Sequence, residues 1–221
     1  MDTLYANTTD GAPRRNFLVR VVGATMLGYA ALATGAARAN AVNLADDGAN
    51  WPGKLRGRHR QVVDAYESNF GFPLAFAYTF LLPNSAPGAA TAVVVLRHGA
   101  FPIALKSAMW AKYKIGETMK IIDPETKAPA IKNPFLDPKP GVLQVDGMAV
   151  DRLLASGTVF GACNVALTVL SQKHASNAGV TAEEAAKEWA ANLIPGITLI
   201  PSGTWGVNRA QEAGCTYCAG G

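Results

Sequence analysis

The sequence predicts an α/β fold: a layered sandwich with a mostly parallel sheet of about five strands, flanked by helices. Apolar, β-branched stretches alternate with helical stretches along the chain, which is typical of a parallel sheet. One stretch, TAVVVLRHGA at 91–100, is apolar on both faces, as a central parallel strand must be. Residues 57–221 are enough for one domain with a single core.

The N-terminal segment predicts export. Residues 12–18 read APRRNFL, and a Gly/Ala-rich apolar stretch follows that ends in Ala-Arg-Ala at 37–39. This order is that of a signal peptide, and Arg14-Arg15 resembles the twin-arginine signal. We therefore expect 1–39 to engage the twin-arginine translocase and be removed, leaving a periplasmic protein with no membrane attachment. An N-terminal membrane anchor is the alternative, although a weakly hydrophobic stretch of 17 residues with three glycines is marginal for a bilayer.

The first half of the domain predicts two strands and two helices. The polar segment at 40–56 is expected to be a linker or N-terminal arm. HRQVVDAY at 59–66 is a short β-type run, and FPLAFAYTFLLPN at 72–84 is apolar all round, which favours a buried helix. Gly99 ends the strand at 91–100, and Pro102 precedes a helix expected at 103–116.

Residues 117–145 contain five prolines, which exclude a regular helix or a central strand. We expect a long surface excursion with a functional or oligomeric role.

The second half continues the alternation. Thr181 and Glu184 match a capping box at a helix start. The last seven residues are expected to form an edge strand. The remaining expected elements are helices at 146–157, 164–177, 181–194 and 204–214, and strands at 158–163 and 196–203.

Three of these strands end in polar residues, at the edge where ligands bind in open parallel sheets. They are Arg97-His98, Cys163-Asn164, and Ser202-Gly203-Thr204. We take Cys163, His98 and Arg97 as candidate catalytic residues, and Asn164, Ser202, Gly203 and Thr204 as candidate ligand-binding residues.

Cys163 lies where a helix N-terminus would favour a thiolate, and Arg97 or His98 would add to that. The alternatives are that Cys163 is a small core residue, that His98 only shapes a turn, and that Ser202 or Thr204 only caps a helix.

The chain has three cysteines, an odd number for an oxidising compartment, so at least one thiol has no partner within the chain. Cys215 and Cys218 could form a terminal disulfide, remain uninvolved, or have a redox or metal role. Residues three apart on a strand face opposite sides, so a disulfide would need a turn. We see no further zinc ligands with suitable spacing, and we expect neither a metal nor a cofactor.

The net charge of +4 includes no dense Lys/Arg cluster, so we expect no nucleic-acid binding. Phosphate loops, dinucleotide fingerprints and zinc-protease motifs are also missing from the sequence.

Three blocks resemble the DsrE/DsrF-like family: VVVLRHG at 93–99, the strand ending in Cys163, and LIPGITLIPSG at 193–203. The resemblance covers residues 59 to the end and is strongest to exported members. It implies a compact α/β sandwich that assembles as a homo-oligomer, a trimer or hexamer, with sulfur carried as a persulfide on Cys163. The proline-rich segment, the export signal and the Cys215/Cys218 pair depart from the family pattern.

The sequence leaves three functions open. The first is a sulfur carrier that works through Cys163. The alternatives are a non-catalytic periplasmic module that binds a small ligand or metal, and an oligomeric scaffold.

Overall fold

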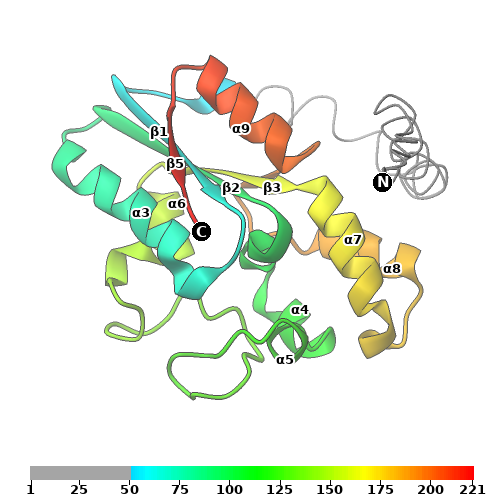
Figure 1. The fold of residues 1–221 in the computed structure, drawn as a ribbon. Helices are drawn as coiled ribbons and strands as arrows, with labels where there is room; N and C mark the ends of the chain where they lie inside the picture. The colour runs from blue at the N-terminus through cyan, green and yellow to red at the C-terminus, as the bar shows by residue number, and fades with distance from the viewer. Residues whose placement is uncertain (1–50) are drawn as a thin grey trace, which may run out of the picture. The chain divides into compact units, whose positions relative to one another are not determined.

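A computed structural model describes residues 51–221; the predicted signal peptide and residues 40–50 of the predicted linker lie outside this range. Five strands form one sheet in the order β4-β3-β2-β1-β5, and every neighbouring pair is parallel (Figure 1). The strands are β1 (His59–Ala65), β2 (Ala90–Leu96), β3 (Val159–Cys163), β4 (Ile197–Ile200) and β5 (Thr216–Ala219). The predicted α/β class is confirmed.

Helices cover both faces of the sheet. The α-helices are α3 (Phe72–Leu81), α4 (Ser107–Lys112), α5 (Ile115–Thr118), α6 (Val150–Ala155), α7 (Asn164–His174), α8 (Ala182–Ala191) and α9 (Gly203–Glu212). The 3-10 helices are η1 (Trp51–Lys54), η2 (Asn69–Gly71), η3 (Leu82–Asn84), η4 (His98–Ala104), η5 (Asp146–Met148) and η6 (Ala175–Ala178). Helix α9 lies on one face, and α3 to α8 pack on the other (Figure 1).

The alternation of side chains along β2 creates two cores. Val94 and Leu96 point into the larger core under α3 to α8, while Val93 and Val95 point into the smaller core under α9. All four are fully buried. This explains why the strand is apolar from Ala92 to Leu96.

Trp51 belongs to the smaller core. Its side chain is fully buried, and its indole N–H donates to the carbonyl of Phe160 at 3.2 Å. A side chain at Gly161 would press on Ile200 and on the ring of Trp51, so the middle of β3 is small where Trp51 packs. The end of the predicted linker is therefore part of the domain.

The helix predicted at 103–116 is wrong in its bounds and continuity. Pro102 lies inside η4, Leu105 is extended, and the helical residues beyond it divide into α4 and α5. Leu105 forms an antiparallel bridge with Leu193, and its carbonyl accepts from the side chain of Asn133 at 2.8 Å. These contacts come from distant segments and compete with the helical hydrogen bonds.

The proline-rich segment forms no helix or strand after α5, apart from an isolated bridge between Ile122 and Pro129. It nevertheless contributes buried residues, among them Asn133 and Phe135. The amide of Asn133 donates to the carbonyls of Ile103 and Leu105 and accepts from the backbone N–H of Phe135. The segment is therefore fixed to the domain through its middle.

The connections after β3 and β4 leave the sheet on opposite faces. Cys163 leads into α7 on the larger-core face, and Ser202 leads into α9 on the other face. In open α/β sheets, ligands bind at the carboxyl ends of neighbouring strands whose connections diverge in this way.

Candidate functional site

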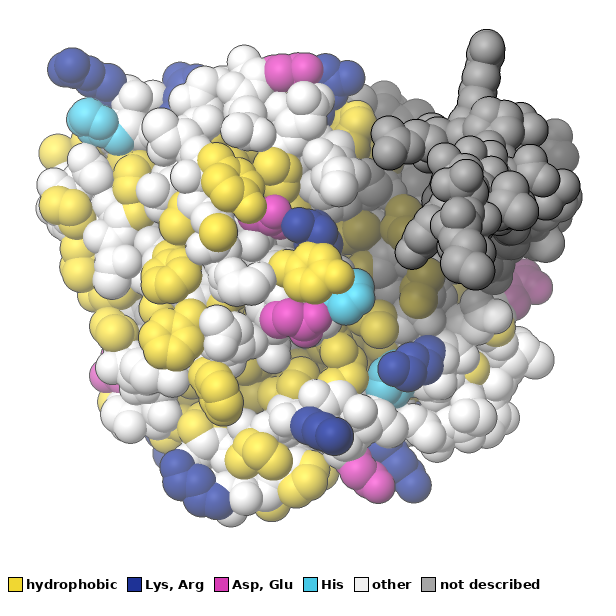
Figure 2. All heavy atoms as spheres, viewed as in Figure 1, with side chains coloured by type: hydrophobic (Ala, Val, Ile, Leu, Met, Phe, Trp, Pro, Cys, Tyr) yellow, Lys and Arg dark blue, Asp and Glu magenta, His cyan; other side chains and the backbone are white. Residues whose placement is uncertain are grey.

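The three predicted strand ends lie at one edge of the sheet, because β2, β3 and β4 are neighbours. Leu96 pairs with Ala162, and Cys163 pairs with Ile200. Arg97, Cys163 and Ile200 therefore occupy the same level on adjacent strands. In Figure 2, acidic, basic and histidine side chains gather near the middle of the displayed face, and hydrophobic side chains surround them.

Cys163 is both the last residue of β3 and the N-cap of α7. The residue is 5% exposed, and its Sγ accepts a hydrogen bond from the backbone N–H of Ala166 at 3.3 Å. Unpaired N–H groups at a helix start carry partial positive charge and favour an anionic sulfur. Among the described residues no side chain donates to this sulfur.

Asn164 follows Cys163 and contains a buried carbonyl oxygen, Oδ1, with no hydrogen-bond partner among residues 51–221. A buried acceptor without a donor is unfavourable by about 1–3 kcal/mol. The side chain of Asn164 therefore holds an unused hydrogen-bond acceptor at the start of α7.

Arg97 is paired with Asp64 at the end of β1. Its Nε and Nη2 donate to the two oxygens of Asp64 at 2.6 and 2.8 Å, and the hydroxyl of Tyr217 donates to Asp64 at 3.2 Å. The bond to Asp64 raises the pKa of Arg97. The charge of Arg97 is thus balanced by Asp64, which sequence reasoning did not single out. Asp64 is the lone acid of the β-type run at 59–66, which marks it as unusual but does not identify Arg97 as its partner.

The side chain of Arg97 also contacts the loop that starts α9. A Cβ added to Gly203 would meet Cβ and Cδ of Arg97, so only glycine leaves room for the arginine stem. The structure therefore brings together two predicted site residues, Arg97 after β2 and Gly203 after β4.

His98 is held in a strained position at the surface. Its backbone has φ 46°, its Nδ1 lies 2.7 Å from Oε1 of Glu67, and its ring stacks on Tyr66 at 4.3 Å. A side chain at Gly99 would collide with the carboxylate of Glu67. Since Glu67 occupies Nδ1, Nε2 is the nitrogen of His98 that can exchange a proton with a bound molecule. Tyr66 and Glu67 were missed because they lie at and just after the end of the predicted first strand, without a recognisable motif.

Of the two capping residues that the sequence offered, Ser202 and Thr204, the structure has Ser202 as the N-cap of α9. Its hydroxyl accepts from the backbone N–H of Trp205 at 3.2 Å and lies 3.2 Å from Oγ1 of Thr204. The capping bond does not consume both lone pairs of Ser202, so the hydroxyl can still contact a ligand.

Cys215 and Cys218 are free thiols on opposite faces of the sheet. Burial raises the pKa of Cys215 to about 11 and also raises the pKa of Cys218. Because β5 is extended between them, the turn that a disulfide would require is not present.

Among residues 51–221, no three Cys, His, Asp or Glu side chains come close enough to hold a metal ion. Within the same range, no helix combines the length and hydrophobicity that a bilayer crossing requires. The chain matches no protein-family model, no curated protein and no solved structure.

Proposed function

We propose that the protein carries sulfane sulfur as a persulfide on Cys163 and is an exported member of the DsrE/DsrF-like family. The observation that supports this most directly is the hydrogen bond from Ala166 to Sγ at the junction of β3 and α7. This junction presents the sulfur to the positive end of a helix at the ligand-binding edge of the sheet.

The proposed step balances with a persulfide donor, R–S–SH. The thiolate of Cys163 attacks the outer sulfur, a new S–S bond forms on Cys163, and the donor's S–S bond breaks as R–S⁻ leaves. The proton that Cys163 loses beforehand goes to a base at the same edge, and our candidate is His98, oriented by Glu67. Arg97 is neutralised by Asp64 and serves to order the edge.

The test is the intact mass of the full chain, isolated without reductant, after incubation with inorganic polysulfide and alkylation of free thiols. We expect added sulfur on Cys163 in the parent chain and in a Cys215→Ser/Cys218→Ser control. Cys163→Ser should contain none, and it should keep its fold because serine is a preferred N-cap. Equal loading of Cys163→Ser would refute the proposal.

Export by the twin-arginine pathway, periplasmic location and homo-oligomeric assembly belong to the same proposal. Export rests on the sequence of residues 1–39. The expected result is that Arg14→Lys/Arg15→Lys leaves the uncleaved protein in the cytoplasm, detected by mass after cell fractionation. Processing and export of this variant at the normal level would contradict the assignment.

The unpaired oxygen of Asn164 supports a second candidate, a binding module without a covalent step. In that case a ligand would raise the unfolding temperature of Cys163→Ser as much as that of the parent chain.

A further inference from the structure

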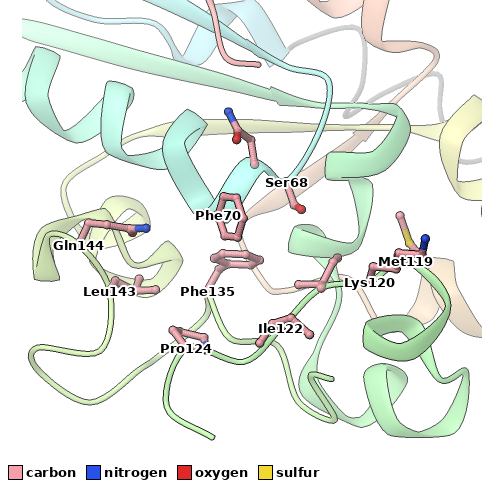
Figure 3. A pocket seen from close by; sticks show the side chains of 11 residues that line it. Ser68, Phe70, Met119, Lys120, Ile122, Pro124, Phe135, Leu143 and Gln144 are labelled. Atoms are coloured by element: carbon pink, nitrogen blue, oxygen red, sulfur yellow. The ribbon is translucent and has the colours of Figure 1, made fainter. Parts of the chain in front are cut away.

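A second site lies apart from Cys163, between the loop after β1 and the proline-rich segment. It is a cavity of about 160 Å³. Figure 3 shows the rings of Phe70 and Phe135 at its centre, with Ile122, Pro124 and Leu143 around them. The residues that line it are Ser68, Asn69, Phe70, Met119, Lys120, Ile121, Ile122, Pro124, Phe135, Leu143 and Gln144.

One wall of this cavity is rigid. Phe135 is 3% exposed, and Trp110 packs against the edge of its ring. Its backbone N–H donates to the buried side chain of Asn133, and its carbonyl accepts from Val150 at the start of α6. The cavity is thus formed before any ligand enters, which reduces the entropy lost on binding.

The opposite wall stores strain. Phe70 is 72% exposed and has φ 54°, a left-handed conformation that is unfavourable for a bulky side chain. Asn69 and Lys120, which also line the cavity, have φ 37° and 55°. Gly71 holds the loop in place, because its own φ is 84° and a side chain there would press on Phe135. Strained residues of this kind concentrate at ligand sites.

The charge in the lining of the cavity is of one sign, positive. Lys120 is the one charged residue among those that line it. The acids near Pro124 are occupied, since Asp123 accepts from two backbone N–H groups and Glu125 pairs with Lys132 and Lys139. The cavity therefore offers apolar and aromatic contact together with a cation at its edge, and no competing carboxylate.

We propose that this cavity binds a small aromatic carboxylate, with its ring against the side chains of Phe70 and Phe135 and its acid group toward Lys120. Its volume is close to that of apolar protein cavities of about 150 Å³ that hold benzene. The strained backbone of Phe70 places an apolar ring in solvent, which is unfavourable. Contact with a bound aromatic ring would offset that loss. Gln144 and Ser68 supply hydrogen-bonding groups beside the apolar walls, the usual composition of a small-molecule site.

The experiment is crystallisation of the protein with 4-bromobenzoate, with the bromine located by anomalous scattering, and calorimetric titration of benzoate and benzamide. We expect bromine inside this cavity and saturable benzoate binding with a Kd below about 1 mM. Benzamide, which is neutral and of the same shape, should bind at least about threefold more weakly. Bromine elsewhere, or no saturation by about 10 mM benzoate, would overturn the proposal.

Two variants separate binding from folding. Phe70→Gly removes the ring and relieves the positive φ, so we expect an unchanged or higher unfolding temperature with at least about tenfold weaker benzoate binding. Phe76→Ala, which removes an exposed ring of α3 outside the cavity, is the control and should bind normally. Normal binding by Phe70→Gly would exclude the assigned site.

Lys120→Asn tests the carboxylate. Asparagine tolerates the left-handed backbone at this position and removes the charge. The variant should bind benzoate and benzamide equally. A retained preference for benzoate would show that Lys120 does not select the anion.

Discussion

Asp64 is a buried carboxylate, 7% exposed, whose charge is balanced by Arg97 at 2.6 Å. Removing one member of such a pair leaves the other charge buried and unpaired. We expect Arg97→Met to lower the free energy of unfolding by about 3 kcal/mol, measured by urea denaturation.

The double variant Arg97→Met/Asp64→Asn provides the check on this pair. It should be more stable than Arg97→Met, because the stranded charge is gone. If the double variant instead lost as much unfolding free energy as Arg97→Met and Asp64→Asn lose together, the result would contradict an ion pair at this position.

The cysteines differ in environment, and their reactivity should differ accordingly. The pKa of Cys215 is raised to about 11, so at pH 8 about one thiol in a thousand is ionised. We expect iodoacetamide to leave Cys215 unmodified in the folded protein and to modify it once urea unfolds the chain. Mass spectrometry of peptides reports both. Rapid labelling of Cys215 in the native state would show that the β5 edge opens.

Positions in the candidate site were predictable from the sequence where a strand end could be recognised. Cys163 and Ser202 are N-caps at the predicted strand-to-helix junctions. The partner of Arg97 was not predictable, because Asp64 is 33 residues away and becomes adjacent only through the parallel pairing of β1 with β2. A single sequence shows where strands end, but it does not show which side chains the sheet places next to each other.

Helix α8 begins with the predicted capping box. The hydroxyl of Thr181 accepts from the N–H of Glu184 at 3.2 Å, and Glu184 accepts from the N–H of Thr181 at 2.8 Å. We expect Thr181→Ala to reduce stability by about 1 kcal/mol in urea denaturation. Glu183→Gln, in the same helical turn but outside the box, is the matched control and should have little effect. An equal effect of both substitutions would indicate general helix charge rather than capping.

At the level of elements, local patterns predicted all five strands and failed beside η4. Strand β2 was recognisable because β-branched residues fill it and both of its faces are buried. Pro102 is compatible with a helix start, but the carbonyls of Ile103 and Leu105 are taken by the side chain of Asn133. That competition comes from a segment about thirty residues later, which lies outside any local window.

The whole molecule should lose stability in acid in two stages, and the first belongs to His174. This residue is 1% exposed, and burial lowers its pKa below 6.5. The unfolded chain then binds a proton that the folded chain rejects, so the free energy of unfolding falls as the pH drops below about 6.5. His174→Gln should flatten this stage in urea titrations between about pH 7 and 5. An unchanged slope would assign the proton uptake to another group.

The second stage belongs to carboxylates such as Glu188. Its hydrogen bonds with Lys112 and Tyr113 lower its pKa below 4.5. The stability that these bonds contribute is present above that pH and is lost as the pH falls below it. Glu188→Gln should therefore alter the profile below about pH 4.5 and leave the His174 stage in place.

Because β5 lies beside β1, the sheet can be completed only after the last residues of the chain have been synthesised. Gln61 of β1 pairs with Thr216 of β5, and the carbonyl of Asp64 accepts from Gly220. While the ribosome is still making the intervening residues, one side of β1 exposes its unpaired backbone. Strand pairs this distant in sequence form slowly, and until they form the unpaired strand edge is prone to aggregation. We therefore expect β1 to keep one side unpaired until residues 216–219 have been synthesised and pair with it.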